Sequence, residues 1–278
     1  MDFDTKPASD YSLPDVVEIL NRGFESYFVT IKFNVNTFLS LVRKDGVDLP
    51  VSRVLLADGE PAGIALLARR GWTSRLAAMG IAQNVRAMGA GSWLMDQLIR
   101  EACERGEREM FLEVIEQNEP AVHLYQKYGF EIVRQLIGLI RKEAVEEQPR
   151  ELEEMDVREA ARLISQYGLP DLPWQLSAES IAQMNPPTCA YKNGQACIVI
   201  SNPEANDIAI WSLLVKPNER GNGLGVETLK AIITQYPMKT WHVSAVLPEE
   251  LGKIYERAGF VREQLSQWQM RLNLKDKT

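Results

Sequence analysis

Apolar and polar positions follow two different periods along the first half of the chain. The segment GSWLMDQLIREACERG (91–106) places apolar residues at 93, 94, 98, 99 and 102, which is a helical period. Leu13 to Phe24 is also predicted to be a helix, because Ser12 can cap it and Pro14 suits its first turn. Further helices are expected at residues 36–44 and 119–129. Strand-like runs occupy residues 52–58, 61–71, 75–83, 109–116 and 130–142, the first two joined at Asp58-Gly59.

The second half repeats this order, with early helices that we expect to be shorter. A hairpin is predicted around Asn193-Gly194, followed by a strand at 207–215 and a helix at 225–236. The predicted fold class is therefore α+β. Each half has a mixed, mostly antiparallel sheet with helices on both faces.

Two motifs recur in the same order. RAMGAG begins at Arg86 and RGNGLG at Arg220, an offset of 134 from 86 to 220. LYQKYGF around Tyr125 is echoed by IYERAGF around Tyr255, an offset of 130 from 125 to 255. The chain is therefore a tandem duplication. The charged run at 146–156 contains Pro149, so we predict domains at 1–146 and 147–278.

Composition restricts the function. Hydrophobic residues make up 45% of the 278 positions and charged residues 25%, as in ordinary globular proteins. A net charge of −7 argues against a nucleic-acid partner, because phosphate binding needs excess basic charge. No run approaches about 18 apolar residues, so no membrane span is expected.

Cysteines and histidines carry no metal signature. Cys103, Cys189 and Cys197 lack paired metal spacing, and only two histidines are present, so no metal is expected. Cys189 and Cys197 could face each other across a hairpin, where a reduced pair is the preferred interpretation. The polar, acidic start of the chain does not resemble a signal peptide, and the expected location is cytoplasmic.

The glycine-rich turns have a direct chemical meaning. Glycine lets the backbone turn tightly, and the helix that follows presents free N–H groups and a positive dipole end to an anion. A pyrophosphate suits such a site, and the leading arginine adds positive charge. Ser92 and Val226 follow the last glycines where a nucleotide P-loop needs lysine, and no acidic residue supports a Rossmann site.

In each half, the glycine-rich loop is followed by the motif Y-x-x-x-G-F. This order, present twice, resembles the GNAT superfamily of acetyl-CoA-dependent N-acetyltransferases, and the resemblance covers nearly the whole chain. The resemblance implies that acetyl-CoA is the acetyl donor and that both loops and the strand ends before them hold the coenzyme. The implied residues of the first copy are Met79, Ile81, Arg86, Ala87, Met88, Gly89, Ala90, Gly91, Ser92 and Asn118. Those of the second copy are Leu213, Val215, Arg220, Gly221, Asn222, Gly223, Leu224 and Gly225.

The same resemblance implies that Tyr125 and Tyr255 are general acids for the departing thiolate; a packed helix aromatic is the alternative for each. A phenol with a reference pKa of about 10 suits protonation of a thiolate. Glu113 and Glu116 are candidate bases. They are three residues apart on one strand, so at most one faces substrate, and a water is the alternative base.

The copies depart from the family pattern in different places. Gln83 replaces the usual proline before the first loop, and Pro248 stands seven residues before Tyr255 where Asn118 precedes Tyr125. We therefore expect the first domain to catalyse and the second to bind coenzyme or to support the first. The predicted acceptor is a primary amine of a small molecule or peptide, and both a monomer and a homodimer are compatible with the sequence. The alternative function is a non-catalytic acyl-CoA-binding or assembly protein.

Overall fold

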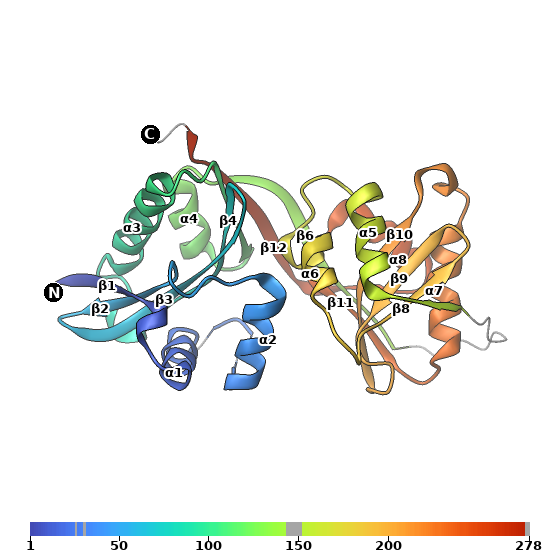
Figure 1. The fold of residues 1–278 in the computed structure, drawn as a ribbon, viewed down its shortest axis with the longest axis horizontal. Coiled ribbons are helices and arrows are strands. Elements are labelled where there is room, and N and C mark those ends of the chain that lie inside the picture. Colours follow the sequence, from blue (N-terminus) through green and yellow to red (C-terminus); the bar gives the residue numbers. More distant parts are fainter. Residues whose placement is uncertain (26, 30–31, 143–151, 276–278) are drawn as a thin grey trace. The chain divides into compact units, whose positions relative to one another are not determined.

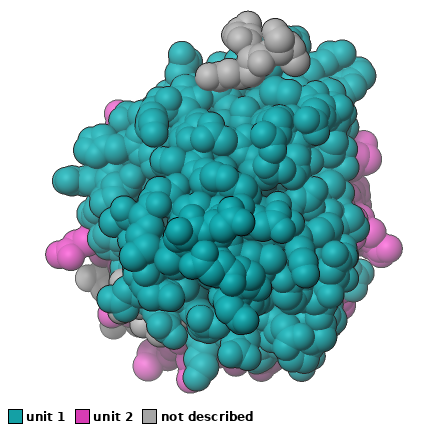
Figure 2. All heavy atoms as spheres, turned by 90° about the vertical axis from the view of Figure 1, so that its left-hand side faces the viewer, with its two compact units in different colours: residues 1–133, 268–278 teal, residues 134–267 magenta. Residues whose placement is uncertain are grey.

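The structure is a computed structural model, and it describes residues 1–25, 27–29, 32–142 and 152–275. The chain divides into two compact units, which Figure 1 shows as a ribbon and Figure 2 in separate colours. Unit 1 consists of Met1–Val133 and Trp268–Thr278, and unit 2 of Arg134–Gln267. In the part of the chain that the structure describes, no helix is long and apolar enough to cross a membrane.

The described residues of unit 1 form five strands and four α-helices before its closing strand. They are β1 (Phe3–Pro7), η1 (Ala8–Asp10), α1 (Leu13–Gly23), α2 (Val35–Asp45), β2 (Arg53–Ala57), β3 (Glu60–Arg70), β4 (Thr73–Ile81), η2 (Gln83–Val85), α3 (Ala90–Glu104), β5 (Glu109–Ile115) and α4 (Glu119–Lys127). The strands lie in the order β1-β2-β3-β4-β5, antiparallel except for the parallel pair β4 and β5.

Both faces of this sheet are buried, because successive apolar side chains of β3 point to opposite faces. Ile64 and Leu66 pack with α1 and α2 on one face. Ala65 and Leu67 pack with α3 and α4 on the other. The predicted helices and strands of this half are confirmed, with Ser12 capping α1 as expected. Strand β1 was not anticipated, since its polar sequence FDTKP is half exposed at the sheet edge.

Strands β4 and β5 separate in the middle of unit 1. Their paired register runs only from Thr73 opposite Glu109 to Leu76 opposite Leu112. The register of β4 with β3 shifts at the same point, so Ala77 is an extra residue that bends the strand. The ends of the two strands are therefore separated beside the glycine loop that follows β4.

Unit 2 repeats this plan. Its elements are β7 (Glu153–Met155), α5 (Val157–Tyr167), η3 (Trp174–Leu176), α6 (Ala178–Ala182), β8 (Cys189–Asn193), β9 (Ala196–Ile200), β10 (Asp207–Val215), η4 (Pro217–Glu219), α7 (Leu224–Gln235), β11 (Thr240–Pro248), η5 (Glu249–Leu251) and α8 (Gly252–Arg257). The strand order is β11-β10-β9-β8-β7. The expected shorter early helices are confirmed for α6 but not for α5, which has the 11 residues of α1.

Strands β10 and β11 of unit 2 separate in the same way. Parallel pairing of β10 with β11 ends at Ala209 opposite His242, and the register with β9 shifts around Trp211. Trp211 therefore takes the place of Ala77, so the bulge at the start of the cleft is a property of both copies.

The last strand of each sequence copy packs into the core of the unit formed mainly by the other copy. The first copy ends in β6 (Glu131–Arg141), whose Ile137 and Leu139 pack into the core of unit 2. The second copy ends in β12 (Val261–Asn273), whose Met270 and Leu272 pack into the core of unit 1. The strand order agrees, since β12 lies beside β5 as well as β6. The predicted boundary at 146/147 lies outside the described residues, and the packing units differ from 1–146 and 147–278 through this exchange.

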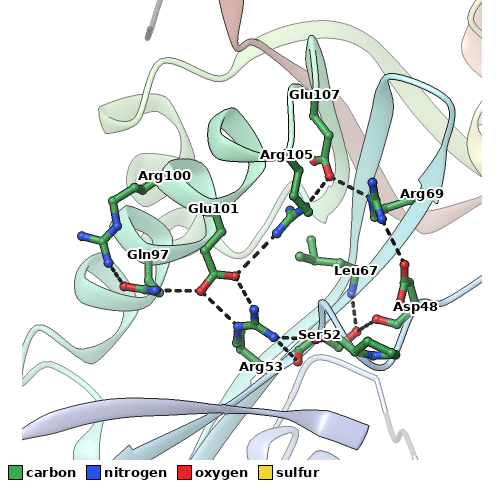
Figure 3. A network of polar contacts seen from close by, with 11 residues as sticks. Asp48, Ser52, Arg53, Leu67, Arg69, Gln97, Arg100, Glu101, Arg105 and Glu107 are labelled. Atoms are coloured by element: carbon green, nitrogen blue, oxygen red, sulfur yellow. Dashed lines mark hydrogen bonds and ion pairs between the residues drawn. The ribbon is translucent and has the colours of Figure 1, made fainter.

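Charged residues hold the C-terminal end of α3 against the sheet (Figure 3). Arg53 on β2 bonds Glu101 on α3, with 2.7 Å between Nη2 and Oε2. Glu107 after the helix bonds both Arg105, at 2.7 Å, and Arg69 on β3, at 2.9 Å. Arg69 also contacts Asp48, so it serves the scaffold at the end of α3 remote from the glycine loop.

The three cysteines are free thiols in the structure. Cys189 pairs in register with Ile200, and Cys197 with Lys192, so the two cysteines do not face each other across the hairpin. Because Cys197 lies three residues away from Ile200, the position opposite Cys189, disulfide formation there has no geometric basis.

Candidate functional site

The glycine loop of each unit links the end of a cleft strand to the start of a helix. In unit 1, Ala87 and Gly89 have φ of 62° and 85°; in unit 2, Gly221 and Gly223 have φ of 87° and 86°. Gly89 and Gly223 are the N-caps of α3 and α7, and neither provides a side-chain cap. The first-turn N–H groups thus face outward from a bare helix start, which is the arrangement that binds anions.

The arginine at the start of each loop bonds the backbone. Arg86 donates to the carbonyl oxygen of Ile81 at 2.8 Å and to that of Gly23 at 3.0 Å. Arg220 repeats the pattern with Val215 and Tyr167. The sequence suggested that each arginine supplies positive charge to an anionic ligand. In the structure, each guanidinium instead anchors its loop to the end of a strand and to the end of α1 or α5.

The last glycine of each loop allows close packing. A Cβ on Gly91 would lie 3.3 Å from Leu124 and 3.4 Å from Ile81, and one on Gly225 would lie 3.3 Å from Ile254. Met79 and Leu213 also contact these glycines from the cleft strands. The loop therefore lies directly on the strand end that precedes it. Met88 and Asn222, between the left-handed residues, are exposed.

Ala90, Ser92 and Leu224 lie in the first turns that follow the loops. The carbonyl oxygen of Ser92 accepts a hydrogen bond from the hydroxyl of Tyr128 at 2.7 Å, which ties α3 to the end of α4. The loop residues predicted from sequence are thus together in each unit.

Three polar side chains lie close together in unit 1. Asn118 is the N-cap position of α4, and its side chain is hydrogen-bonded to Tyr27. Tyr125 lies on the next turn of α4, packed against Phe130, with 5.8 Å between ring centroids. Burial raises the pKa of the Tyr125 phenol well above its usual value, and the neighbouring Tyr27 adds to the shift. Tyr125 therefore keeps its proton at physiological pH.

Tyr27 was not found by sequence reasoning. It lies beyond α1 and packs edge-on against Phe24, with 5.1 Å between ring centroids. Burial raises the pKa of Tyr27, while the hydrogen bond from Asn118 acts in the opposite direction. Its contact with Asn118 joins residues 91 positions apart in sequence, from 27 to 118, so no local pattern could indicate it.

The two candidate bases lie in different surroundings. Glu113 is buried against Arg75, with 2.7 Å between Oε2 and Nη2, and Arg75 also bonds Asp45 of α2 at 3.1 Å. These carboxylates neutralise a guanidinium whose side chain is only 6% exposed. Glu116 follows β5 and is half-buried. Glu113 is therefore committed to an ion pair, which leaves Glu116 as the candidate base of the two.

The corresponding region of unit 2 shares the buried tyrosine but lacks the asparagine. Tyr255 is buried on α8 against Phe260, and burial raises its pKa, as in Tyr125. Pro248 ends β11 where Asn118 stands in unit 1. A cavity of about 470 Å³ runs from the loop at Arg220 to Gly225 past Tyr255 to α5. Among the described residues, no group of three or more His, Cys, Asp or Glu is placed to hold a metal ion.

Each unit therefore combines a pair of separated parallel strands, a glycine loop and a buried helix tyrosine. Residues 13–130 match the acetyltransferase (GNAT) family. A streptothricin acetyltransferase from Streptomyces lavendulae is 38% identical over 76 residues, which are 27% of this chain and 40% of that relative's length.

Solved structures are similar over nearly the whole chain. A GCN5-related N-acetyltransferase from Sphaerobacter thermophilus superposes with a TM-score of 0.69 at 17% identity, covering 98% of this chain and 96% of the other. A tandem GNAT protein from the clavulanic acid biosynthesis pathway gives a TM-score of 0.66 at 13% identity and 98% coverage of both chains. Residues 13–130 therefore resemble the GNAT family, and the chain has the fold of tandem GNAT proteins, which confirms the predicted fold class and resemblance.

Proposed function

We propose that the protein transfers the acetyl group of acetyl-CoA to a primary amine of a small molecule or peptide, and that unit 1 performs the reaction. The observation that carries this proposal is the group of Asn118, Tyr27 and Tyr125 near the glycine loop of unit 1. The family match to residues 13–130 lies in the same unit.

Coenzyme binding would depend mainly on backbone groups. The bare N-terminus of α3 supplies N–H donors for the pyrophosphate, and the loop from Arg86 to Ser92 surrounds it. The strand end from Met79 to Ile81, separated from β5, is open to the pantetheine amides. Asn118 would exchange its contact with Tyr27 for one with the coenzyme arm.

The reaction would proceed by direct attack in a ternary complex. The neutral amine forms a bond to the thioester carbonyl carbon, and the carbonyl oxygen becomes an oxyanion. As the C–S bond breaks, Tyr125 gives its proton to the coenzyme sulfur. The new amide nitrogen loses a proton to Glu116 or to water, and that proton balances the one donated by Tyr125.

The acceptor proposal rests on chemistry and on one relative. The name of streptothricin acetyltransferase says that it acts on streptothricin, an amine-bearing antibiotic, so such antibiotics belong among the acceptors to be tested. We place the protein in the cytoplasm, where acetyl-CoA is supplied, as a monomer or homodimer.

Thiol release from acetyl-CoA with a panel of amines tests the proposal. Tyr125→Phe should lower kcat by about 10²- to 10⁴-fold with a smaller change in acetyl-CoA affinity, because it removes a proton donor and keeps the ring. Tyr255→Phe is the matched control and should leave the rate within twofold. Unchanged rates in Tyr125→Phe would disprove the assignment. Coenzyme binding without turnover for any amine would instead support the alternative, a non-catalytic acyl-CoA-binding protein.

A further inference from the structure

The cavity of unit 2 passes through the sheet between the separated strands β10 and β11. One end is formed by the glycine loop and the start of α7, including Arg220 and Leu224. The other end is formed by α5 and the residues after it, including Ile164, Leu172 and Leu176. The cavity is therefore continuous with the anion site and reaches the far face of the sheet.

The two units differ at the point where α1 or α5 crosses the cleft strand. In unit 1, Gly23 ends α1, and a Cβ built on it would lie 2.8 Å from the backbone of Gly80 on β4. In unit 2, Tyr167 accepts from Arg220 as Gly23 accepts from Arg86, and Leu214 stands one residue before the strand end, as Gly80 does. Two glycines that let helix and strand touch are thus replaced by two large side chains, both near the cavity wall.

The wall at the far end of the cavity is apolar. Ile164, Leu172, Leu176 and Trp211 line it, and Ile210 and Val243 face each other where the strands part. Four charged residues line the cavity elsewhere: Arg220 bonds backbone carbonyls, Glu219 accepts from Asn222 at 3.5 Å, Glu250 bonds Arg134 at 2.8 Å, and Arg257 lies on α8. Pro248 replaces the amide of Asn118. An amine acceptor would find few hydrogen-bond partners at this end of the cavity. A hydrocarbon chain would be removed from water there, which favours its binding.

We propose that unit 2 binds a coenzyme A thioester whose acyl group is a hydrocarbon chain longer than acetyl, with the chain lying between β10 and β11 and pointing toward α5. The inference rests on the proposed use of the glycine loops as pyrophosphate sites. It adds a substrate class that we do not expect unit 1 to share, because Gly23 and Gly80 bring α1 and β4 into contact there. A fully buried methylene improves binding about fourfold, so a chain of several carbons distinguishes the two units clearly.

Calorimetric titration of the full chain with acetyl-CoA, octanoyl-CoA and free coenzyme A tests this. The matched loop variants are Met88→Glu in unit 1 and Asn222→Glu in unit 2, because both positions are exposed and each variant puts a carboxylate at one anion site. Octanoyl-CoA should bind at least 30-fold more tightly than acetyl-CoA, and Asn222→Glu alone should abolish that preference. A second variant, Leu172→Trp, fills the far end of the cavity and should lower octanoyl-CoA affinity at least tenfold without weakening free coenzyme A.

Equal affinities for the two thioesters, or an octanoyl preference that survives Asn222→Glu, would overturn the inference and leave acetyl transfer by unit 1 intact. An octanoyl preference confined to unit 2 in a protein that releases no thiol with any amine would overturn the proposed function and support the inference. The two failures are therefore distinguishable in the same set of variants.

Discussion

Single residues in this protein often serve the scaffold where the sequence suggested chemistry. The guanidinium of Arg86 bonds the carbonyls of Ile81, Gly23 and Glu25 and so fixes the loop to two elements. Arg220 does the same in unit 2. Because a planar fork can satisfy several carbonyls at once, lysine would not replace either arginine. The arginine therefore holds the loop in place and leaves the N–H groups at the helix start for the proposed ligand.

Glu113 illustrates the same point and gives a prediction. It is buried with Arg75, so Glu113→Gln should lower the free energy of unfolding by about 1 to 3 kcal/mol, since a charged hydrogen bond is weakened while Asp45 still compensates the guanidinium. The pH at which activity rises should not move. Denaturant unfolding and a pH–rate profile measure the two effects.

Glu116→Gln is the control, with little effect on stability because Glu116 is half-buried. If Glu116 is the base, this variant should lose the acid limb of the profile. A stable Glu113→Gln protein with a shifted acid limb would show that the roles are reversed.

At the scale of elements, the bulges at Ala77 and Trp211 separate parallel strands that would otherwise stay paired. The helix that crosses the strand end then differs between the units. In unit 1 the crossing is a contact between Gly23 and Gly80, and in unit 2 Tyr167 and Leu214 stand at the corresponding positions. The two units therefore differ in side-chain volume at the crossing, whereas their loops have similar backbone conformations.

This argument predicts the effect of a single methyl group. Gly23→Ala should destabilise unit 1 by about 1 to 3 kcal/mol, because its Cβ would lie 2.8 Å from the backbone of Gly80, which cannot move as a side chain can. Gly91→Ala is a matched control, since its Cβ meets only side chains, at 3.3 Å or more. Thermal unfolding of both variants measures the difference. Equal stabilities would contradict the idea that α1 rests on β4 at this point.

At the scale of the whole molecule, the two copies exchange their last strands. Leu272 of β12 is 2% exposed in the core of unit 1, and Leu139 of β6 is 0% exposed in the core of unit 2. A strand encoded at the end of the chain therefore completes the unit that begins it. Neither copy has its full core until both closing strands are in place.

The exchange predicts crossed effects of core mutations. Leu272→Ala should cost about 2 to 5 kcal/mol and expose amides of unit 1, although it lies in the second copy; Leu139→Ala should do the same to unit 2. Hydrogen exchange followed by mass spectrometry locates the loss of protection. The opposite pattern, with each variant weakening its own copy, would refute the exchange.

The sequence by itself determined the duplication, the main helices and strands and the two loops. It could do so because hydrophobic period, turn residues and repeated motifs are local signals. Only the tertiary structure decided that Tyr27 meets Asn118, that Glu113 is paired with Arg75, and that β6 and β12 close each other's units. These facts depend on packing between residues distant in the chain. Two copies of one pattern are equally compatible with either closing strand until the cores are formed.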